Sequence, residues 1–514
     1  MAEGRSRISC ANLDHAELIG KIPDYERLTT QTMTETTSWF RTANRALLPA
    51  AMTLTLATCA TNPVTGKREL ALISEGQEIQ MGQEAKDQVI ASIGLVPDSG
   101  LQRYVSGLGL AMARTSERPN LPWSISVVDD PMVNAFALPG GPVFITRGIL
   151  AHMNSEAQLV SVLGHEIGHI TAKHSVAQMS QAQLGQIGII AATIAKPGLA
   201  QFGELAAQGL GVLFLKFGRD DERQSDDLGF RYMTNAGYDP GEMAEMFRTL
   251  ERLGAGSEGE GRVPQWLSTH PDPGNRVQAT MQKIAATSLP AGLKVERDAF
   301  LQRTDGIIFG ENPRQGFFRQ SLFLHPDLKF QLDFPSGWKT QNTMTAVIGV
   351  SAQQDAMMAL ELAGETSPSQ GLSQFLSQEG VQSQGTSSSP INGMQAASAA
   401  FTAQTQQGTV AGNVVYISLD GRTYRIMAYT PSQMYGNYRG AFSQSLGSFR
   451  RLTDPAALAV QPVRVHLVRL PRNMTIAEFN QSYPSKIPVA QVALINGVDP
   501  STQIPAGTLV KRVQ

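Results

Sequence analysis

The chain has 514 residues, of which 42% are hydrophobic and 17% charged. This composition is typical of globular proteins, and the length predicts two to four domains rather than a single core. With 42 basic and 44 acidic residues the net charge is −2, which excludes the strongly basic surface of a nucleic-acid-binding protein. Cys10 and Cys59 are its two cysteines, too few for a disulfide framework.

A targeting segment is expected near the N-terminus. Two arginines precede the apolar run ALLPAAMTLTLATC, which ends at Cys59 and is too short to span a bilayer. The final LATC resembles the lipobox of bacterial lipoproteins, in which the cysteine is lipidated. We therefore expect a signal peptide over residues 33–59, lipidation of Cys59, and an upstream mis-start or a disordered segment over residues 1–32. A plain signal peptide cut nearby, or a buried apolar helix, would give the same pattern.

Helical sequence is expected from Glu75 to Met112, and strands are expected after it. SISVV alternates between polar and apolar residues, and PVFIT is a second β-rich run. The segment from Asn134 to Gly141 between these runs is expected to turn. Its last two residues, Gly140 and Gly141, mark either the turn or a place where a peptide backbone comes close.

The stretch VLGHEIGHITAKH contains the spacing H-E-x-x-H. A Ser-x-x-Gln capping pattern precedes it and apolar residues recur at helical spacing, which predicts a helix with one buried face. His165 and His169 are four residues apart and point the same way, as chelation of one zinc ion requires. Glu166 is placed to act as the general base. A helix with two structural histidines is the alternative.

A catalytic zinc site also needs a third protein ligand and an open position. The metzincin pattern fails here, because its further glycine and histidine positions are Ala172 and Ser175. His174 comes one residue early and falls on the apolar stripe of the helix. We therefore expect His174 to be structural and turned away from the ligands.

A second helix, predicted from FGRDDERQSDDLGFRYMTNAGYDP and ending near Gly237, offers the third ligand. On it Glu222 and Asp226 are four residues apart and share a face. Glu222 would bind the metal, and Asp226 would accept the free ring N–H of a ligand histidine and fix its tautomer. Spacing alone leaves a solvated acidic face as the alternative.

Three motifs carry a family resemblance. NAFALPGG, VLGHEIGHITAKH and GRDDERQSDDLGFRY…AGYDP resemble the signatures of the HtpX-type zinc metallopeptidases, a family that includes the CAAX prenyl endopeptidases and periplasmic lipoprotein proteases. The resemblance covers residues 60–310 and implies a mainly helical gluzincin domain with one zinc ion per chain. It implies as ligands His165, His169 and Glu222, as catalytic base Glu166, and as supporting acidic residue Asp226.

A further segment, LSTHPDPGNRV, resembles a part of this family that faces the zinc ion. The resemblance implies that His270 is a fourth ligand in a closed form or, alongside Arg276, a donor to the oxyanion. A capping loop with a surface histidine is the alternative.

The apolar run over residues 186–217 is broken by Lys196-Pro197-Gly198 and by Glu204. Neither half is long enough to span a membrane. We expect Ala/Gly-rich helices packed over the cleft, where they would act as a lid or plug.

The rest of the chain predicts two accessory domains. Residues 318–452 read as strands and helices of an α/β sandwich with a hairpin turn at Asp420-Gly421, and they resemble domains of the PsbP/Mog-one type. Residues 463–514 read β-α-α-β and resemble a LysM module, which binds peptidoglycan-type glycans. The usual Gly-Asp-Thr opening of that module is absent here, so a LysM-like module that contacts proteins is the alternative.

The expected fold class is therefore multidomain: a mainly α-helical gluzincin metallopeptidase domain with a small sheet, then the α/β sandwich and the small LysM-like domain. We expect a zinc-dependent endopeptidase that acts on envelope proteins in quality control or assembly, in the periplasm and lipid-anchored to the outer membrane. An edge strand would align extended substrates by β-augmentation along Asn134, Ala135, Gly140 and Gly141. Two other functions stay open: a chaperone-like assembly factor with an occluded zinc site, and a peptidoglycan-binding adaptor.

Overall fold

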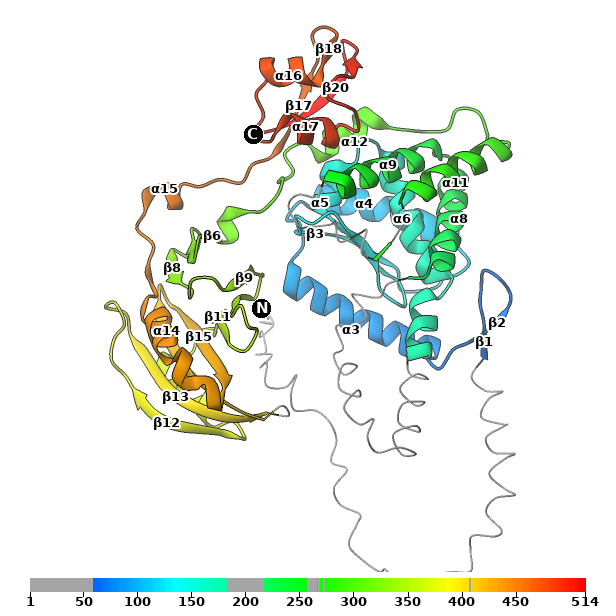
Figure 1. Ribbon diagram of the computed structural model, residues 1–514. Helices are drawn as coiled ribbons and strands as arrows, with labels where there is room; N and C mark the ends of the chain where they lie inside the picture. The colour runs from blue at the N-terminus through cyan, green and yellow to red at the C-terminus, as the bar shows by residue number, and fades with distance from the viewer. Residues whose placement is uncertain (1–58, 183–216, 257–265, 267–268, 271–272, 406–407) are drawn as a thin grey trace, which may run out of the picture. The chain divides into compact units, whose positions relative to one another are not determined.

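A computed structural model describes residues 59–182, 217–256, 266, 269–270, 273–405 and 408–514 (Figure 1). The expected signal peptide before Cys59 and the expected lid helices over 186–216 lie outside the described residues. Among the helices that the structure describes, none is both long enough and apolar enough to cross a membrane.

The described chain opens with a hairpin and two helices. In chain order these are β1 (Cys59–Thr61), β2 (Arg68–Leu70), α3 (Glu75–Ile93) and α4 (Ser99–Ala113). α3 begins at a capping box made by Ser74 and Gln77. It ends at Gly94, whose φ of 80° no helix tolerates. The helical sequence expected from Glu75 to Met112 is thus two helices.

A three-stranded sheet follows, made of β3 (Ser124–Val128), β4 (Ala135–Ala137) and β5 (Pro142–Thr146). β5 is the central strand, parallel to β3 and antiparallel to β4. All five residues of β5 are buried, as in strands that are covered on both faces. β4 is an edge strand, and the expected turn between the two β-rich runs contains it.

Helices build most of the rest of this domain, and six of them have bounds that lie within the described residues. They are α5 (Arg147–His152), α6 (Glu156–Thr171), α8 (Arg219–Asn235), α9 (Gly241–Gly256), α11 (Pro273–Ala286) and α12 (Arg297–Thr304). α6 starts after Ser155, whose hydroxyl accepts the Gln158 N–H, as the capping pattern predicted. Every residue of α6 from Ala157 to Thr171 is buried, so α6 is the central helix, with α8 and α9 against it (Figure 1).

The next domain is built on a large antiparallel sheet. Its seven strands, in spatial order, are β12 (Val381–Ser387), β13 (Ala396–Thr405), β14 (Gly408–Leu419), β15 (Arg422–Pro431), β11 (Met357–Leu362), β10 (Ala346–Val350) and β9 (Lys339–Asn342). A four-stranded sheet has the order β16 (Arg450–Arg451), β8 (Phe330–Asp333), β7 (Leu322–His325) and β6 (Phe317–Arg319). The turn between β14 and β15 is at Asp420 and Gly421, as predicted, with φ of 51° and 77°.

Two helices cover the seven-stranded sheet. α13 (Pro368–Leu376) packs Leu372 and Phe375 against Val414 and its neighbours, in one hydrophobic cluster. α14 (Tyr435–Gly447) packs Phe442 and Leu446 in a different cluster, which contains Val415. Successive residues of a strand face opposite sides of its sheet, so the helices lie on opposite faces. This is the sandwich of helices and sheet that the sequence predicted.

The C-terminal segment contains α15 (Pro455–Leu458), β17 (Val465–Arg469), β18 (Met474–Thr475), α16 (Ile476–Ser482), α17 (Val489–Ile495), β19 (Gln503–Ile504) and β20 (Leu509–Val513). β17 pairs with β20, and the two helices lie between them in sequence, in the expected β-α-α-β order. Val465 and Leu509 belong to the same hydrophobic cluster as α6. The buried Lys511 donates from Nζ to the carbonyl oxygens of Ala151 and Met153, 2.9 and 2.8 Å away.

Candidate metal centre

Close packing of α6 on α8 brings the candidate ligands together. A Cβ added to Gly164 would lie 3.1 Å from the Gly229 Cα, and one added to Gly168 would lie 3.1 Å from the Ser225 Cα. Two helices approach this closely only where one or both carry small residues. The glycines of the motif therefore let a short glutamate side chain on α8 reach the histidines on α6.

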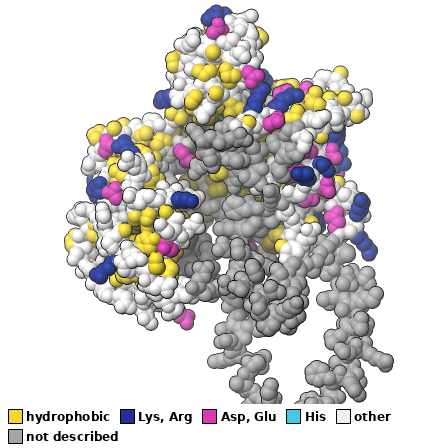
Figure 2. Space-filling view, in the orientation of Figure 1, with side chains coloured by type: hydrophobic (Ala, Val, Ile, Leu, Met, Phe, Trp, Pro, Cys, Tyr) yellow, Lys and Arg dark blue, Asp and Glu magenta, His cyan; other side chains and the backbone are white. Residues whose placement is uncertain are grey.

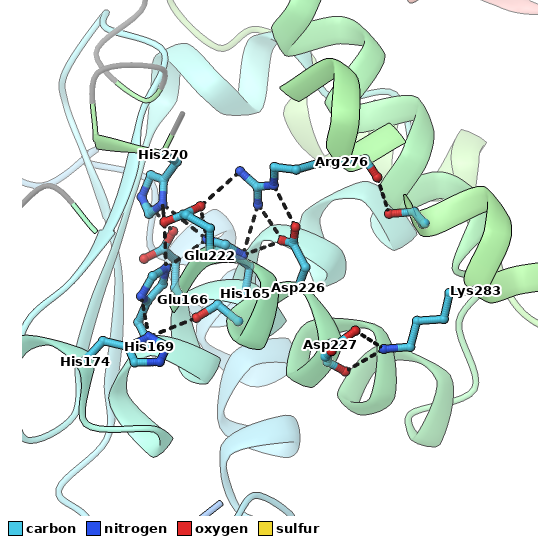
Figure 3. Close-up of polar contacts among 12 residues, drawn as sticks. His165, Glu166, His169, His174, Glu222, Asp226, Asp227, His270, Arg276 and Lys283 are labelled. Atoms are coloured by element: carbon cyan, nitrogen blue, oxygen red, sulfur yellow. Dashed lines mark hydrogen bonds and ion pairs between the residues drawn. The ribbon is translucent and has the colours of Figure 1, made fainter. Parts of the chain in front are cut away.

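The nitrogen and oxygen atoms of four buried residues converge on one point (Figure 3). One ligand atom from each of His165, His169, Glu222 and His270 lies within 4.8 Å of all the others. The Nε2 atoms of His165 and His169 are 3.0 Å apart, and the Glu222 carboxylate is 3.4 Å from His169 Nε2. Nδ1 of His270 is 2.8 Å from Glu222 Oε1. The structure thus brings together the three expected ligands and the expected fourth residue.

The chemistry of this set fits a metal ion. Two imidazoles and a carboxylate are the donors that catalytic zinc sites use, and two ring nitrogens in contact are stable when they share a cation. Both carboxylate oxygens of Glu166 are buried without a hydrogen-bond partner in the described structure. Burial raises the pKa of Glu166, although His270 and His165 lower it in part. A buried carboxylate without partners, next to the convergent donors, suits a general base that faces a water molecule.

Asp226 and Arg276 support the ring of His165 through hydrogen bonds. Asp226 Oδ1 accepts from His165 Nδ1 at 2.9 Å, which leaves His165 Nε2 free for a metal. Nε and Nη2 of Arg276 donate to the two oxygens of Asp226, at 2.7 and 2.5 Å. Burial alone would raise the pKa of Asp226, but Arg276 and His165 outweigh it and lower that pKa.

His174 supports the second ligand histidine, contrary to the expectation that it turns away. Lys173 has a φ of 60°, so α6 ends and the chain turns His174 back toward the site. His174 Nε2 lies 2.9 Å from Gln224 Oε1, which only accepts, so His174 Nδ1 is left as an acceptor. His169 Nδ1, 3.0 Å away, then carries the proton and His169 Nε2 is free for a metal. The prediction failed because it extended the helix through Lys173.

Two aromatic side chains cover the donor set. Phe217 stacks on His169 with ring centroids 4.0 Å apart, and Trp266 stacks on His270 at 4.8 Å. The backbone N–H of Trp266 also donates to the carbonyl of Val133, next to β4. Sequence reasoning missed both aromatics. Trp266 lies four residues before His270, the spacing that places two side chains on one helix face, and this was the available signal.

The residues expected to align a substrate have different surroundings. Asn134 and Ala135 lie at the start of edge strand β4, where Ala135 pairs with Ile145. Gly140 donates its N–H to the buried Glu78 carboxylate, and a Cβ there would lie 2.6 Å from the Ile79 Cα. A Cβ on Gly141 would lie 3.0 Å from the Pro122 carbonyl oxygen. Close packing against neighbouring segments of the protein therefore accounts for both glycines.

A buried H-E-x-x-H helix with a glutamate on a second helix defines a metallopeptidase centre of the gluzincin type. Residues 99–284 match the family model described as Peptidase family M48. This segment contains the four convergent residues and Arg276. This part of the chain is therefore similar to the metallopeptidases of family M48.

Proteins with this domain occur in bacteria and mitochondria. The chain is 30% identical over 253 residues to the "Beta-barrel assembly-enhancing protease" of Escherichia coli (strain K12), covering 47% of this chain and 51% of that protein. It is 28% identical over 239 residues to the "Mitochondrial metalloendopeptidase OMA1" of Arabidopsis thaliana, covering 46% of this chain and 45% of that protein. The chain thus spans about half the length of these relatives.

Among solved structures, part of the chain is similar to a cyanobacterial PsbP from Synechocystis sp. PCC 6803. The match has a TM-score of 0.23 and 11% identity and covers 26% of this chain and 95% of that one. A similarity of this size supports no conclusion about function.

Proposed function

We propose that the protein is a zinc-dependent endopeptidase of the bacterial envelope that acts on other envelope proteins. The observation that carries the proposal is the convergence of His165, His169 and Glu222, with the Glu166 carboxylate, which accepts no hydrogen bond in the described structure, beside them. The relatives named beta-barrel assembly-enhancing protease support an envelope location and a role in assembly or quality control.

His165, His169 and Glu222 would hold zinc, which when bound supplies a Lewis acid that polarises the peptide carbonyl and makes water a better nucleophile. Glu166 takes the proton of the attacking water and passes it to the leaving amine. Burial raises the pKa of Glu166, which makes its carboxylate a better proton acceptor. His270 lies beside Glu166, 3.7 Å from Oε1, and would stabilise the developing negative charge once it leaves Glu222.

A second candidate function is a latent protease or chaperone-like factor. It is favoured by the closed state of the site: His165, His169, Glu222 and His270 are each at most 3% exposed. His270 also fills the space next to Glu222 that a substrate carbonyl would need. Cleavage would then require movement of the segment that carries Trp266 and His270.

The proposal also includes a lipid anchor at Cys59 in the outer membrane, with the peptidase domain in the periplasm. The lipobox-like LATC supports the anchor. The order of strands and helices after residue 463 is compatible with a LysM-like module, which would bring peptidoglycan into contact with the enzyme. On the face shown in Figure 2, basic and acidic side chains are interspersed, so charge alone does not single out a partner there.

The test is cleavage of casein, an unfolded substrate, by the full-length protein and by Glu166→Gln. Glu166→Gln leaves the three ligands in place, so it should retain zinc and lose at least about 100-fold in cleavage rate. Cleavage by both proteins at the same rate would contradict the assignment of Glu166. If neither protein cleaves although both hold zinc, the latent function is favoured, and His270→Ala should then start cleavage.

A further inference from the structure

We propose that Arg276 is a positioning residue, which holds Asp226 and Glu222 in place for the metal, and is not the donor to the substrate oxyanion that the sequence suggested. This inference rests on the proposed zinc centre. It adds to that centre a residue on a third helix, α11, that acts through two others.

The contacts of Arg276 with Asp226 are bidentate. Nε and Nη2 donate to Oδ2 and Oδ1 at 2.7 and 2.5 Å, the geometry that fixes a carboxylate in one plane (Figure 3). The same Oδ1 accepts from His165 Nδ1. Because Asp226 sets the orientation and tautomer of His165, Arg276 acts on this ligand through Asp226, and its Nη2 also lies 3.1 Å from His165 Nδ1.

The remaining sides of the guanidinium are also occupied by protein. Nη1 lies 3.2 Å from Glu222 Oε2, the second negatively charged group of the site. The Phe247 and Trp266 rings cover the guanidinium, with Cζ 4.2 and 4.6 Å from their centroids. Arg276 is 6% exposed. Nη1 forms an ion pair with Glu222 without a hydrogen bond, and Nε and Nη2 donate to Asp226, so the enclosed guanidinium is placed to hold these two carboxylates.

Charge balance gives the arrangement a further reason. The carboxylates of Glu166 and Glu222 are buried, and that of Asp226 close by is only partly exposed to water. A divalent cation would compensate two of the three negative charges. The positive charge of Arg276 compensates the third. Buried carboxylates that lose their partner are strongly destabilised. Without Arg276, Asp226 would be expected to turn away, and His165 would lose its acceptor.

The same two helices provide a matched control. Lys283 on α11 pairs with Asp227 on α8, one turn or more away from the metal cluster and with side chains 34% and 69% exposed. We would compare Arg276→Gln, Asp226→Asn, the double variant and Lys283→Gln in the full-length protein. The measurement is the zinc dissociation constant, from competition with a chromogenic chelator, together with kcat and KM for a peptide substrate.

Positioning through Asp226 predicts that Arg276→Gln and Asp226→Asn each weaken zinc binding about 10- to 100-fold. The effects of the two substitutions should add only in part, because both remove the contact between Arg276 and Asp226, and the contact of Arg276 with Glu222 is the part that they do not share. Lys283→Gln should leave zinc binding unchanged. If Arg276→Gln does not fold, Arg276→Lys, which keeps the charge but loses the bidentate contact, should still bind zinc more weakly than the wild type.

Zinc binding as tight as in the wild type, with kcat lowered and KM unchanged, would overturn the inference and restore the oxyanion role. Full additivity of the two substitutions would also overturn it. A wild-type protein that binds no zinc would overturn the proposed function itself, so the two failures are distinguishable.

Discussion

The second ring nitrogen of each histidine in the H-E-x-x-H motif has a partner of its own. Asp226 accepts from His165, and His174, itself fixed by Gln224, accepts from His169. Both histidines therefore present Nε2 to the same point. The acceptor for His165 could be predicted from spacing on one helix. The acceptor for His169 could not, because it depends on a left-handed residue, Lys173, that periodicity does not reveal.

A buried histidine outside the site gives a prediction about pH. His152 lies in α5, its Nδ1 2.7 Å from the Gly148 carbonyl oxygen, and burial lowers its pKa to about 4. In the unfolded chain the pKa is near 6.5, so the unfolded state binds more protons between pH 6.5 and 4. The contribution of His152 to the free energy of unfolding is therefore fully present above pH 6.5. It falls by up to about 3 kcal/mol as the pH drops through this window.

The measurement is the free energy of unfolding by urea at pH 7 and pH 4.5, for the wild type, His152→Gln and His466→Gln. The loss of stability on acidification should be smaller in His152→Gln than in the wild type. His466, whose side chain is 43% exposed, serves as the control and should leave the loss unchanged. An equal loss in all three proteins would show that His152 is not buried as a neutral group.

At the scale of elements, helix α3 packs against the turn that follows β4. Gly82 of α3 lies against the Pro139 carbonyl, where an added Cβ would be 1.8 Å from the oxygen. The Glu78 carboxylate accepts from the Gly140 N–H and from Arg118 at 2.7 and 2.9 Å, and Arg118 also donates to the carbonyl of Ile170 at the end of α6. Helix α3 therefore connects the sheet edge to the catalytic helix.

This packing predicts a strong difference between two glycines of one helix. Gly82→Ala forces a methyl group into backbone and should destabilise the protein by about 1 to 3 kcal/mol. Gly76→Ala has no atom within 4 Å of its new Cβ and should be neutral or slightly stabilising. The midpoints of urea unfolding of the two variants give the comparison. Equal midpoints would mean that α3 does not pack on the turn as described.

Elements with a strong local signal could be predicted from the sequence. The start of α6 at Ser155 follows from its capping pattern, and the hairpin at Asp420-Gly421 follows from its turn chemistry. The contacts between elements could not be predicted. Gly140 was expected to lie close to the backbone of a substrate. A backbone does lie close to Gly140, but it is that of helix α3.

At the scale of the whole molecule, the C-terminal segment belongs with the catalytic domain. Strand β17 continues into backbone hydrogen bonds with residues 306–309, and Val465 lies in the core that contains α6. The buried Lys511 of this segment donates two hydrogen bonds to carbonyl oxygens at the end of α5. Burial lowers the pKa of Lys511. The sequence pattern led us to expect a separate domain over residues 463–514, and it did not predict this attachment, which involves residues far apart in sequence.

The central claim is that one zinc ion is bound by His165, His169 and Glu222. The most direct measurement is zinc content and the zinc K-edge X-ray absorption spectrum of the purified full-length protein. We predict one zinc per chain, with nitrogen and oxygen neighbours at about 2.0–2.2 Å, and loss of that zinc in His165→Ala with His169→Ala. Protein without zinc, zinc with a sulfur neighbour, or full zinc content in the double variant would contradict this account.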